Sequence, residues 1–432
     1  MAKVLMLGWE FPPLFSGGLG VATYGIVKAL CPKIQIKLII PTVGYSFDLT
    51  NTDIIGLNHI TSESINLERL QFNLSFANTE VVSLPLMVSP YHYVNSKIER
   101  NNLDLSAFDR ITQGKKNLDV INEIFSSPEL YGSNIMHKVY IFAKLAEEIA
   151  SDGDFDVIHS HDWITFSAGI AIKKRTGKPL VLHVHALETD RVDHATRNEI
   201  YGMEKNAMEI ADKVIAVSQY TKDQIIQHYQ IDPAKISVVH NGIEPIHAVR
   251  KPHALKDKLV VFLGRITNQK GPQFLLETAE KVSRVYPRVK FIVAGTGDQF
   301  AHLLEDSAYR KIGSKFIFTG FLPKEKVNEL FAMSDVYFMP SVSEPFGLSA
   351  LEATQYSVPS VISTQSGASE VLKASLKADF WDTDKFANYI YALLKYDVLS
   401  KELSEKAKHE LQTLTWNDAA EKIRNVYKEV ML

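Results

Sequence analysis

The chain has 432 residues, with 47 lysines and arginines against 50 aspartates and glutamates, and 46% of its residues are hydrophobic. At roughly 100–200 residues per domain, this length predicts two or three domains, each able to bury a core of its own. The formal net charge of −3 excludes a general electrostatic attraction to nucleic acid or to anionic lipid. Any anionic ligand must therefore be bound by a local cluster of donors.

The single cysteine, Cys31, excludes an intrachain disulfide and any zinc or iron–sulfur site built on cysteine ligands, which fits a reducing compartment. The apolar stretch Val4–Leu7 near the N-terminus is too short for the core of a signal peptide. No run approaches the roughly 18 apolar residues that a membrane-spanning helix requires. We therefore expect a cytoplasmic protein with no transmembrane segment.

Short, β-branched apolar runs recur along the chain, and segments with helical periodicity separate most of them. This alternation predicts the α/β class, with parallel strands joined by crossover helices. In the first half the predicted strands are Val4–Leu7, Ile34–Ile40, Val81–Leu84, Val157–His159, Leu180–Val184, Val214–Val217 and Ser237–Val239. In the second half they are Leu259–Leu263, Lys290–Ala294, Lys315–Phe318, Val336–Met339 and Ser360–Ile362.

The stretch His240–Lys258 contains glycine, two prolines and mixed charge without a sustained period, so it is interpreted as an interdomain linker. After it, a strand followed by a glycine turn begins the pattern again. We therefore predict two Rossmann-like domains, at residues 1–245 and 246–410, and a C-terminal helix within residues 411–432.

Two segments leave alternatives open. Ser89–Gly132 interrupts the regular spacing of strands and helices, and a loop of this length either meets the substrate or elaborates the surface. Near the C-terminus, Thr415 is a candidate N-cap for an amphipathic helix over Trp416–Val430. That helix either completes the second domain or packs back onto the first.

The first candidate motif, Phe15–Gly20, lies between the first predicted strand and a helical stretch. Its successive glycines, with Gly17 and Gly18 at the centre, allow backbone N–H groups to approach a phosphate closely. The motif is neither the spaced dinucleotide fingerprint nor a P-loop. A phosphate loop and a turn that only reverses the chain both remain open.

The second motif, Gly264–Gly271, follows the first strand of the second domain and carries two cations, Arg265 and Lys270. Ligands of open α/β sheets bind at the carboxyl ends of strands, so this pair suits a diphosphate. The alternative is a basic turn exposed to solvent.

The third motif, Ser343–Glu352, follows another predicted strand. Pro345 suits a first helical turn, which would place Glu344 at the helix entrance and Glu352 about two turns along the same face. Two carboxylates can accept hydrogen bonds from sugar hydroxyls, and the N–H groups of Gly347 and Leu348 can cap a phosphate. Glu352 falls in an apolar stretch where an unpaired carboxylate would be costly, which favours a functional role.

Histidines end two neighbouring apolar strands, His159 and His161 on one and His183 and His185 on the other. A His-x-His pattern places both rings on one face of a strand, so a zinc hydrolase is a rival interpretation. No His-Glu-x-x-His helix supplies further ligands. We favour core positions for His159 and His183, and positions on the catalytic face for His161 and His185.

These motifs, in this order, resemble the GT-B-fold retaining glycosyltransferases, specifically the glycogen and starch synthase-like members of families 4 and 5. The resemblance covers nearly the whole chain. It rests on the segments GGLG, HSHDW, HVHALETDR, ADKVIAVSQYT, HNGIEP, GRITNQKG, VAGTGD, FTGFLPKEKV and SEPFGLSALEA. It implies two Rossmann-like domains facing across a central cleft and transfer of a hexosyl unit from a nucleoside diphosphate sugar.

The resemblance also implies roles for single residues. Arg265 and Lys270 would hold the diphosphate, Glu344 the hydroxyls of the donor sugar, and Glu352 the ribose. The other implied roles are those of Gly18 at the phosphates, the backbone near Phe321 and Leu322 beside the base, His185 near the anomeric carbon and Asp162 on the acceptor side. Since cations on the leaving diphosphate stabilise the transition state, no metal and no other cofactor is expected.

One position departs from the resemblance. Phe15 stands where bacterial synthases that use ADP-glucose usually have a lysine two positions before the paired glycines, which leaves the donor base open between ADP and UDP. We predict a glucosyltransferase that extends an α-1,4-glucan. The nearest rival is a family 4 enzyme acting on a lipid-linked or small-sugar acceptor.

Three further functional classes are a membrane-binding enzyme, a sugar-nucleotide epimerase and a non-catalytic sensor. The basic residues of the first domain alternate with acidic ones, which argues against a membrane-binding face; they include Lys97, Arg100, Lys115, Lys116 and Lys138. A sugar-nucleotide epimerase of the same architecture would need no acceptor. A non-catalytic nucleotide-sugar sensor ranks last, because Arg265 and Glu344 are both present.

Overall fold

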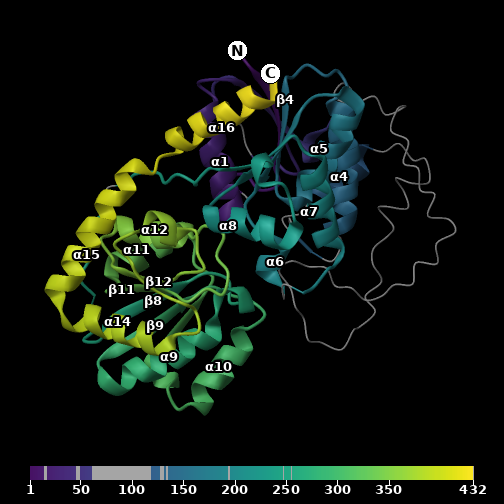
Figure 1. Ribbon diagram of the computed structural model, residues 1–432. Helices are drawn as coiled ribbons and strands as arrows, with labels where there is room; N and C mark the ends of the chain where they lie inside the picture. Colours follow the sequence, from purple (N-terminus) through teal and green to yellow (C-terminus); the bar gives the residue numbers. More distant parts are fainter. Residues whose placement is uncertain are drawn as a thin grey trace, which may run out of the picture.

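A computed structural model describes residues 1–13, 17–44, 49–60, 118–126, 131–132, 135–192, 195–246, 248–253 and 255–431. Three features named above lie outside these ranges: the predicted strand Val81–Leu84, the residue Phe15 and most of the segment Ser89–Gly132. Four of the five basic residues that argue against a membrane-binding face also lie outside them. Two parallel sheets, each flanked by helices, form the two halves of the chain (Figure 1). The predicted α/β class is confirmed.

The first sheet has seven strands in the order β3-β2-β1-β4-β5-β6-β7, and every pairing is parallel. The strands are β1 (Lys3–Leu7), β2 (Gln35–Ile40), β3 (Thr52–Gly56), β4 (Val157–His161), β5 (Leu180–Val184), β6 (Lys213–Ala216) and β7 (Ile236–Val238). The edge strand β3 was not predicted, because it contains only two apolar residues, Ile54 and Ile55, and the others are polar residues and a glycine.

Helices cover both faces of this sheet. Alternate residues of β1 divide between them, with Leu5 and Leu7 in one core and Val4 and Met6 in the other. The helical elements are α1 (Gly18–Leu30), η1 (Leu57–His59), α3 (Leu118–Ser126), α4 (Ile135–Ile149), α5 (Trp163–Thr176), α6 (Glu188–Arg191), α7 (Glu199–Ile210), α8 (Gln219–Gln224), η2 (Ile225–Tyr229) and η3 (Pro233–Lys235). The helix α3 lies inside the segment interpreted as a long loop.

The second sheet repeats the topology with six strands, in the order β10-β9-β8-β11-β12-β13. This is the same order as the first six strands of the first sheet, and it is the doubly wound arrangement of nucleotide-binding domains. The strands are β8 (Lys258–Leu263), β9 (Val289–Ala294), β10 (Phe316–Gly320), β11 (Val336–Met339), β12 (Ser360–Ser363) and β13 (Leu376–Ala378). The three-residue strand β13 was too short for the sequence pattern to show.

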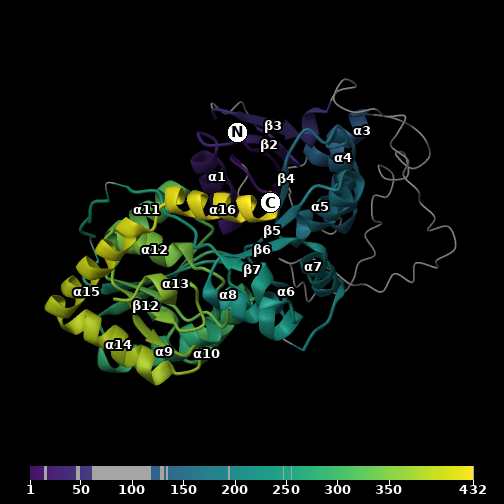
Figure 2. The ribbon, with the colours of Figure 1, turned by 45° about the horizontal axis from the view of Figure 1, so that its top comes forward.

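The helices of the second half surround this sheet (Figure 2). They are η4 (Asn268–Lys270), α9 (Pro272–Val285), α10 (Phe300–Tyr309), η5 (Gly313–Lys315), α11 (Lys324–Met333), α12 (Leu348–Gln355), α13 (Ala368–Val371), α14 (Thr383–Lys395), α15 (Asp397–Glu410) and η6 (Leu411–Thr413). The last helix of the chain, α16 (Trp416–Met431), follows them. Thr415 accepts the Asp418 N–H at 3.1 Å and so caps α16 as predicted.

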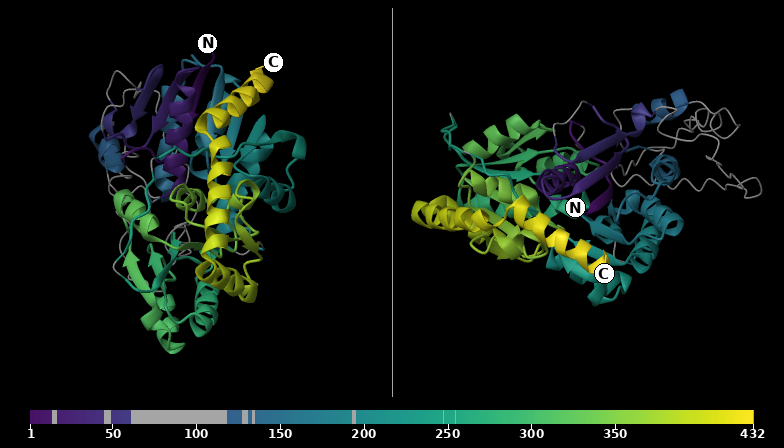
Figure 3. Two further views of the ribbon diagram at one scale, coloured as in Figure 1. Left: turned by 90° about the vertical axis from the view of Figure 1, so that its left-hand side faces the viewer. Right: turned by 90° about the horizontal axis from the view of Figure 1, so that it is seen from above.

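The C-terminal helix α16 packs on the first half, which decides between the two positions that the sequence left open. Its residues Trp416, Ile423 and Tyr427 are buried in the core that contains Val4 and Met6. Figures 2 and 3 show this helix, in yellow, leaving the second half at α15 and lying along the first. The described residues of 239–257 form no helix or strand, and Ile243 N–H donates to Leu414 O at 3.0 Å. The two chain crossings between the halves therefore lie side by side.

The contact between α1 and α16 generates a stability prediction. A Cβ added at Gly25 of α1 would lie 2.3 Å from Trp416 Cε2, whereas one added at Gly202 of α7 would meet nothing within 4 Å. Gly25→Ala should therefore lower the free energy of unfolding by about 1–3 kcal/mol through overpacking. The matched variant Gly202→Ala should raise it by about 0.5–1 kcal/mol. Chemical denaturation of both variants measures this, and equal effects would contradict the packing of α16 on α1.

Candidate active site

The predicted site residues lie in loops that follow the carboxyl ends of the strands in both sheets. Gly18, Asp162 and His185 follow β1, β4 and β5 of the first sheet. The residues Arg265, Phe321 and Glu344 follow β8, β10 and β11 of the second sheet. This is the edge at which open α/β sheets bind their ligands.

The turn that holds Arg265 and Lys270 depends on glycine at its end. Gly271 has φ +68°, and a Cβ there would lie 2.2 Å from Pro340 O, so no other residue fits. This close approach places the turn against the chain after β11, where Val342 N–H donates to Gln269 O at 2.9 Å.

Lys270 forms an ion pair with Glu344 through this approach, so residues 74 positions apart meet. Glu344 is only 7% exposed, and Ser341 Oγ lies 3.4 Å from its Oε2 atom. Arg265, also on the turn, is partly buried. The second and third sequence motifs therefore meet at the Lys270–Glu344 pair, with Arg265 on the same turn as Lys270.

The helix predicted to begin near Pro345 begins instead at Leu348, which is a correction to the sequence interpretation. Gly347 adopts φ +93° as the N-cap, and Glu344 pairs with Ser366 in an isolated parallel bridge. Glu344 and Glu352 therefore do not share one helical face. Gly347 and Leu348 do lie at a helix N-terminus, as predicted.

The argument that Glu352 must be functional because it lacks a partner is wrong. Its carboxylate pairs with Lys324 and its side chain is 22% exposed. That ion pair nevertheless places Glu352 beside Lys324, which is the first residue of α11 and lies two positions after Leu322. Phe321 is 73% exposed. Glu352 and the pair Phe321 and Leu322, expected to hold the nucleoside, therefore lie in one region.

The glycine turn of the first half meets the third motif of the second. Gly17 is the N-cap of α1 and Gly18 its first residue. A Cβ on Gly18 would lie 3.6 Å from Leu348 Cδ1. The N-termini of α1 and α12 therefore approach one another across the boundary between the halves, and helix N-termini carry partial positive charge suited to an anion.

Asp162 has an unusual backbone and fixes the position of His185. Its φ of +59° and ψ of +166° fall in a region that residues other than glycine rarely adopt. Its Oδ1 atom accepts hydrogen bonds from the N–H groups of His185 (2.6 Å) and Ala186 (3.3 Å). Burial raises the pKa of this carboxyl to about 7, with Arg191 and these two hydrogen bonds opposing the rise.

The four strand histidines form a stack. His161 Nδ1 and His185 Nε2 share a hydrogen bond of 2.9 Å, and His159 Nδ1 lies 2.7 Å from Tyr427 Oη of α16. His159, His161 and His183 are fully buried, as expected for His159 and His183. His161, expected on the catalytic face, instead lies beneath His185, which is partly exposed. Burial lowers the pKa of both His159 and His185 to about 3.

Ring orientation in the stack bears on whether it could hold a metal ion. Nitrogen atoms of His159, His161 and His183 lie within 4.8 Å of one another. However, the ring of His183 is inclined by only 14° to that of His159 and by 24° to that of His161. Ligands of one ion direct their lone pairs at a common point, which nearly parallel stacked rings do not do. Among the residues that the structure describes, these three form a packed stack.

Sequence reasoning missed a group of buried charges beside the site. Glu188 and Arg191 of α6 form an ion pair at 3.3 Å, and Glu204 of α7 accepts the Glu188 N–H at 3.0 Å. Burial raises the pKa of Glu204 to about 8, with Arg191 opposing the rise. Asp190, also on α6, is 5% exposed. The pattern Glu-x-Asp-Arg directly after a buried strand could have indicated this group.

Glu10 was missed as well. It follows β1, is 1% exposed, and accepts hydrogen bonds from Tyr131 Oη at 2.6 Å and from Gly20 N–H at 3.2 Å. A carboxylate shortly after a strand end, ten residues before Gly20 of the glycine turn, was the available indication. Its bond to Gly20 holds the first turn of α1 in place.

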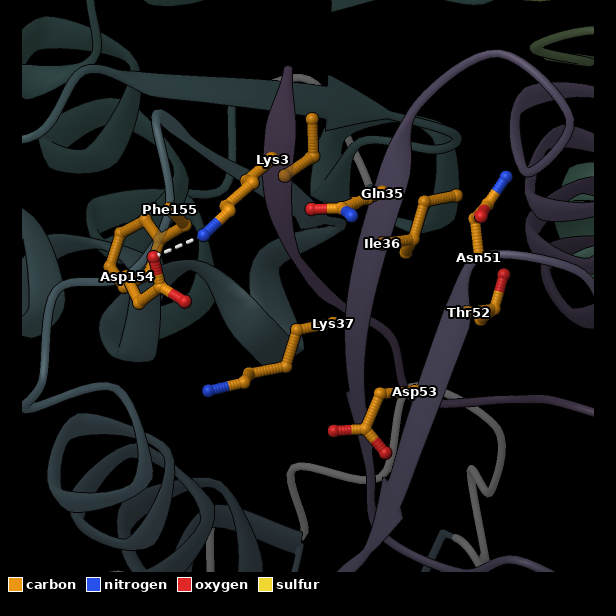
Figure 4. Close-up of a pocket in the computed structure, with 10 residues that line it drawn as sticks. Lys3, Gln35, Ile36, Lys37, Asn51, Thr52, Asp53, Asp154 and Phe155 are labelled. Atoms are coloured by element: carbon orange, nitrogen blue, oxygen red, sulfur yellow. Dashed lines mark hydrogen bonds and ion pairs between the residues drawn. The ribbon is translucent and has the colours of Figure 1, made fainter. Parts of the chain in front are cut away.

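A depression of about 450 Å³ lies at the opposite edge of the first sheet (Figure 4). Lys3, Gln35 and Thr52, the first residues of β1, β2 and β3, line it. Lys3 is paired there with Asp154 at 2.5 Å. Because this depression is at the amino ends of the strands, it is separate from the candidate site.

The chain has two Rossmann-like halves, each a parallel sheet with helices, and the Lys270–Glu344 pair and two helix N-termini lie where the halves meet. Two such halves make up the GT-B fold of glycosyltransferases. Comparison with protein families agrees. The family model described as Glycosyl transferases group 1 matches residues 244–410, and the Glycosyltransferase Family 4 model matches residues 108–246. The chain belongs to the glycosyltransferases that these two adjoining models describe.

Curated relatives have several activities. An uncharacterized glycosyltransferase of Methanocaldococcus jannaschii is 29% identical over 310 residues, or 64% of this chain and 76% of that protein. The glycogen synthase of Mycobacterium tuberculosis is 29% identical over 224 residues, or 50% of this chain and 54% of that protein. The α-maltose-1-phosphate synthase of Mycolicibacterium smegmatis is 28% identical over 310 residues, or 63% and 79% of the two chains. The match to the glycogen synthase thus spans about half of that protein.

Solved structures share the fold. Sucrose-phosphate synthase from Thermosynechococcus elongatus has a TM-score of 0.70 at 15% identity and covers 100% of this chain and 99% of its own. Anabaena HepE, solved with UDP and glucose, has a TM-score of 0.65 at 15% identity and covers 99% and 100%. No helix among the described residues is long and apolar enough to cross a membrane.

The raised pKa of Asp162 generates a pH prediction. Between about pH 4 and 7 the folded chain holds a proton on Asp162 that the unfolded chain has released, so this residue's contribution to stability falls as pH rises through that window. Asp162→Asn removes this contribution and keeps an oxygen for the two N–H donors. The melting temperature of the variant relative to the natural chain should therefore rise between about pH 5 and 8.

Asp53→Asn is the matched control, because Asp53 is an exposed carboxylate on the edge strand β3. Its melting temperature relative to the natural chain should not change with pH across the same window. If the Asp162→Asn difference were equally flat, the carboxyl of Asp162 would be ionised throughout, and the account of its burial would be wrong.

Proposed function

We propose that this chain is a retaining glucosyltransferase that moves a glucosyl unit from ADP- or UDP-glucose to an α-1,4-glucan, without a metal ion. The observation that carries the proposal is the Lys270–Glu344 pair beside the N-terminus of α12, which itself lies close to Gly18 of α1. The pair combines a cation for a diphosphate with a buried acceptor for sugar hydroxyls.

In this proposal Arg265 and Lys270 stabilise the leaving diphosphate. Breaking the anomeric C–O bond builds negative charge on the diphosphate and positive charge on the sugar ring, so fixed cations favour the transition state over the ground state. The N–H groups at Gly18 and Leu348 add partial positive charge at the same oxygens. Glu344 accepts from the sugar hydroxyls, and His185 contributes as a neutral ring near the anomeric carbon, because its pKa is about 3.

The rest of the site would hold the nucleoside and the acceptor. Phe321 offers an exposed ring beside the base, and Glu352 lies nearby for the ribose. Asp162 would serve the acceptor side, as the resemblance implies, and would also hold the backbone of His185. The names of the relatives support both the glucan proposal and a second one, transfer to a small phosphorylated sugar.

The cations generate an activity prediction. Arg265→Ala or Lys270→Ala should each raise the barrier to transfer by about 3 kcal/mol, a loss of roughly a hundredfold in kcat/KM. Initial rates of nucleoside diphosphate release, measured with a saturating acceptor, test this. Lys401→Ala on the exposed face of α15 is the control and should leave the rate unchanged. Near-full turnover in either site variant would overturn the assignment.

Substrates are identified by direct incorporation. Radiolabelled ADP-glucose and UDP-glucose are each incubated with glycogen, maltose, a hexose phosphate and polyprenyl phosphate, and the labelled product is separated. Label in glycogen or maltose supports the glucan proposal, and label only in the hexose phosphate supports the second proposal. Label only in lipid contradicts both. NMR of the first-formed product should show an α linkage, and a β linkage would refute retention.

A further inference from the structure

The loop that carries Glu344 is held from both sides by the first half of the chain. We call residues 341–347 the Glu344 loop. Ser343 and Pro345, the neighbours of Glu344 in sequence, each form hydrogen bonds with side chains of the other half. These bonds cross the boundary between the two sheets at the site itself.

On one side of Glu344, Ser343 Oγ donates to Asp190 Oδ1 of α6 and lies 2.9 Å from Tyr220 Oη of α8. Because the one hydroxyl proton of Ser343 is donated to Asp190, Tyr220 donates to Ser343. The other oxygen of Asp190 accepts Leu187 N–H at 2.7 Å. Asp190 is thereby fixed to its own helix while it holds Ser343.

On the other side of Glu344, the carbonyl oxygen of Pro345 accepts from Ser218 Oγ at 2.6 Å. Ser218 is the N-cap of α8 and also accepts Thr221 N–H at 2.9 Å. Proline has no backbone N–H, so its carbonyl oxygen is the only hydrogen-bonding group at this position.

The carboxylate of Glu370 anchors helix α8 to the second half. Glu370 of α13 accepts the N–H groups of Gln219 (2.9 Å) and Tyr220 (2.7 Å) at the first turn of α8, and pairs with His240 at 2.7 Å. The start of α8 is therefore fixed to the second half independently of the Glu344 loop. Figure 2 shows α8 and α13 next to one another where the halves meet.

Burial gives these bonds their weight. Asp190, Ser218 and Ser343 are 5%, 0% and 2% exposed. A buried polar group that loses its partner is not compensated by water, so each side chain restricts the loop strongly. Lys270, in contrast, fixes the carboxylate of Glu344 only from within the second half.

We propose that Asp190, Ser218 and Tyr220 are positioning residues, which fix the Glu344 loop from the first half so that Glu344 reaches its working position only when the two halves are together. The proposal rests on the donor-sugar role of Glu344 proposed above. It makes the acceptor-side half a structural part of the donor site, and it couples approach of the halves to assembly of the reacting groups.

The first test separates positioning from binding. Ser343→Ala and Asp190→Ala should each lower kcat about tenfold to a hundredfold, because a small displacement of an aligned group is costly to turnover. The dissociation constant for UDP, measured by calorimetry, should stay within about twofold, since Arg265, Lys270 and the helix N-termini are untouched. The loss in the double variant should be smaller than the sum of the two single losses, because each single variant already lacks the Ser343–Asp190 hydrogen bond.

The control variant is Asp53→Ala on β3, which should leave kcat and UDP affinity unchanged. Asp190→Asn retains an oxygen that can accept from Ser343 and should recover part of the activity lost in Asp190→Ala. Natural-chain kcat in both Ser343→Ala and Asp190→Ala would overturn the proposal. So would losses of kcat and UDP affinity that match, because a general structural defect lowers both.

A second measurement does not depend on turnover. Hydrogen exchange of a peptide covering residues 341–347, with UDP present, should be faster in Asp190→Ala than in the natural chain and unchanged in Asp53→Ala. Unchanged exchange in Asp190→Ala would refute the positioning role even if no donor or acceptor were turned over. Failure of the proposed function, in contrast, would appear as absent transfer by the natural chain with the exchange difference intact.

Discussion

The ion pair between Lys270 and Glu344 is the interaction on which the site depends. Removing one partner from a buried pair leaves an uncompensated charge in a region with little water. Each group therefore requires the other, and the turn after β8 and the loop after β11 are held together as a consequence. A bound diphosphate would give Lys270 a second anionic partner. Glu344 would then be freer to accept from sugar hydroxyls, so the pair links donor binding to the readiness of the carboxylate.

The repeated topology explains why the remaining groups converge. Both sheets have the same strand order, and both present their functional loops at carboxyl ends. When the two edges face each other, the N-termini of α1 and α12 meet, as the approach of Gly18 to Leu348 shows. Helix α16 then secures the arrangement, because it belongs to the second half by sequence and to the core of the first by packing.

Sequence reasoning succeeded where a signal is local and failed where it depends on tertiary contacts. Buried strands such as Leu180–Val184 and Val336–Met339 were predicted to the residue, because continuous apolar runs between turns specify them. The predicted helix start at Pro345 was wrong, because Gly347 is the N-cap at a positive φ and the backbone of Glu344 is hydrogen-bonded to Gln365 and Gly367 instead. Glu352 pairs with Lys324, which is 28 positions away. Ser343 bonds to Asp190, which is 153 positions away. No sequence periodicity predicts such pairs.

The histidine stack limits which groups can supply charge. Burial holds the pKa of His159 and His185 near 3 and lowers those of His161 and His183 well below the ordinary value, so the four rings are neutral near pH 7. A neutral ring stabilises a developing charge through a hydrogen bond or its dipole and not as a cation. In the proposed reaction, the positive side-chain charge beside the leaving diphosphate would therefore come from Arg265 and Lys270 and not from the histidines. The ring of His185 is hydrogen-bonded to His161, and the backbone N–H of His185 donates to Asp162. These bonds fix the ring of His185, so its contribution depends on its position rather than on titration.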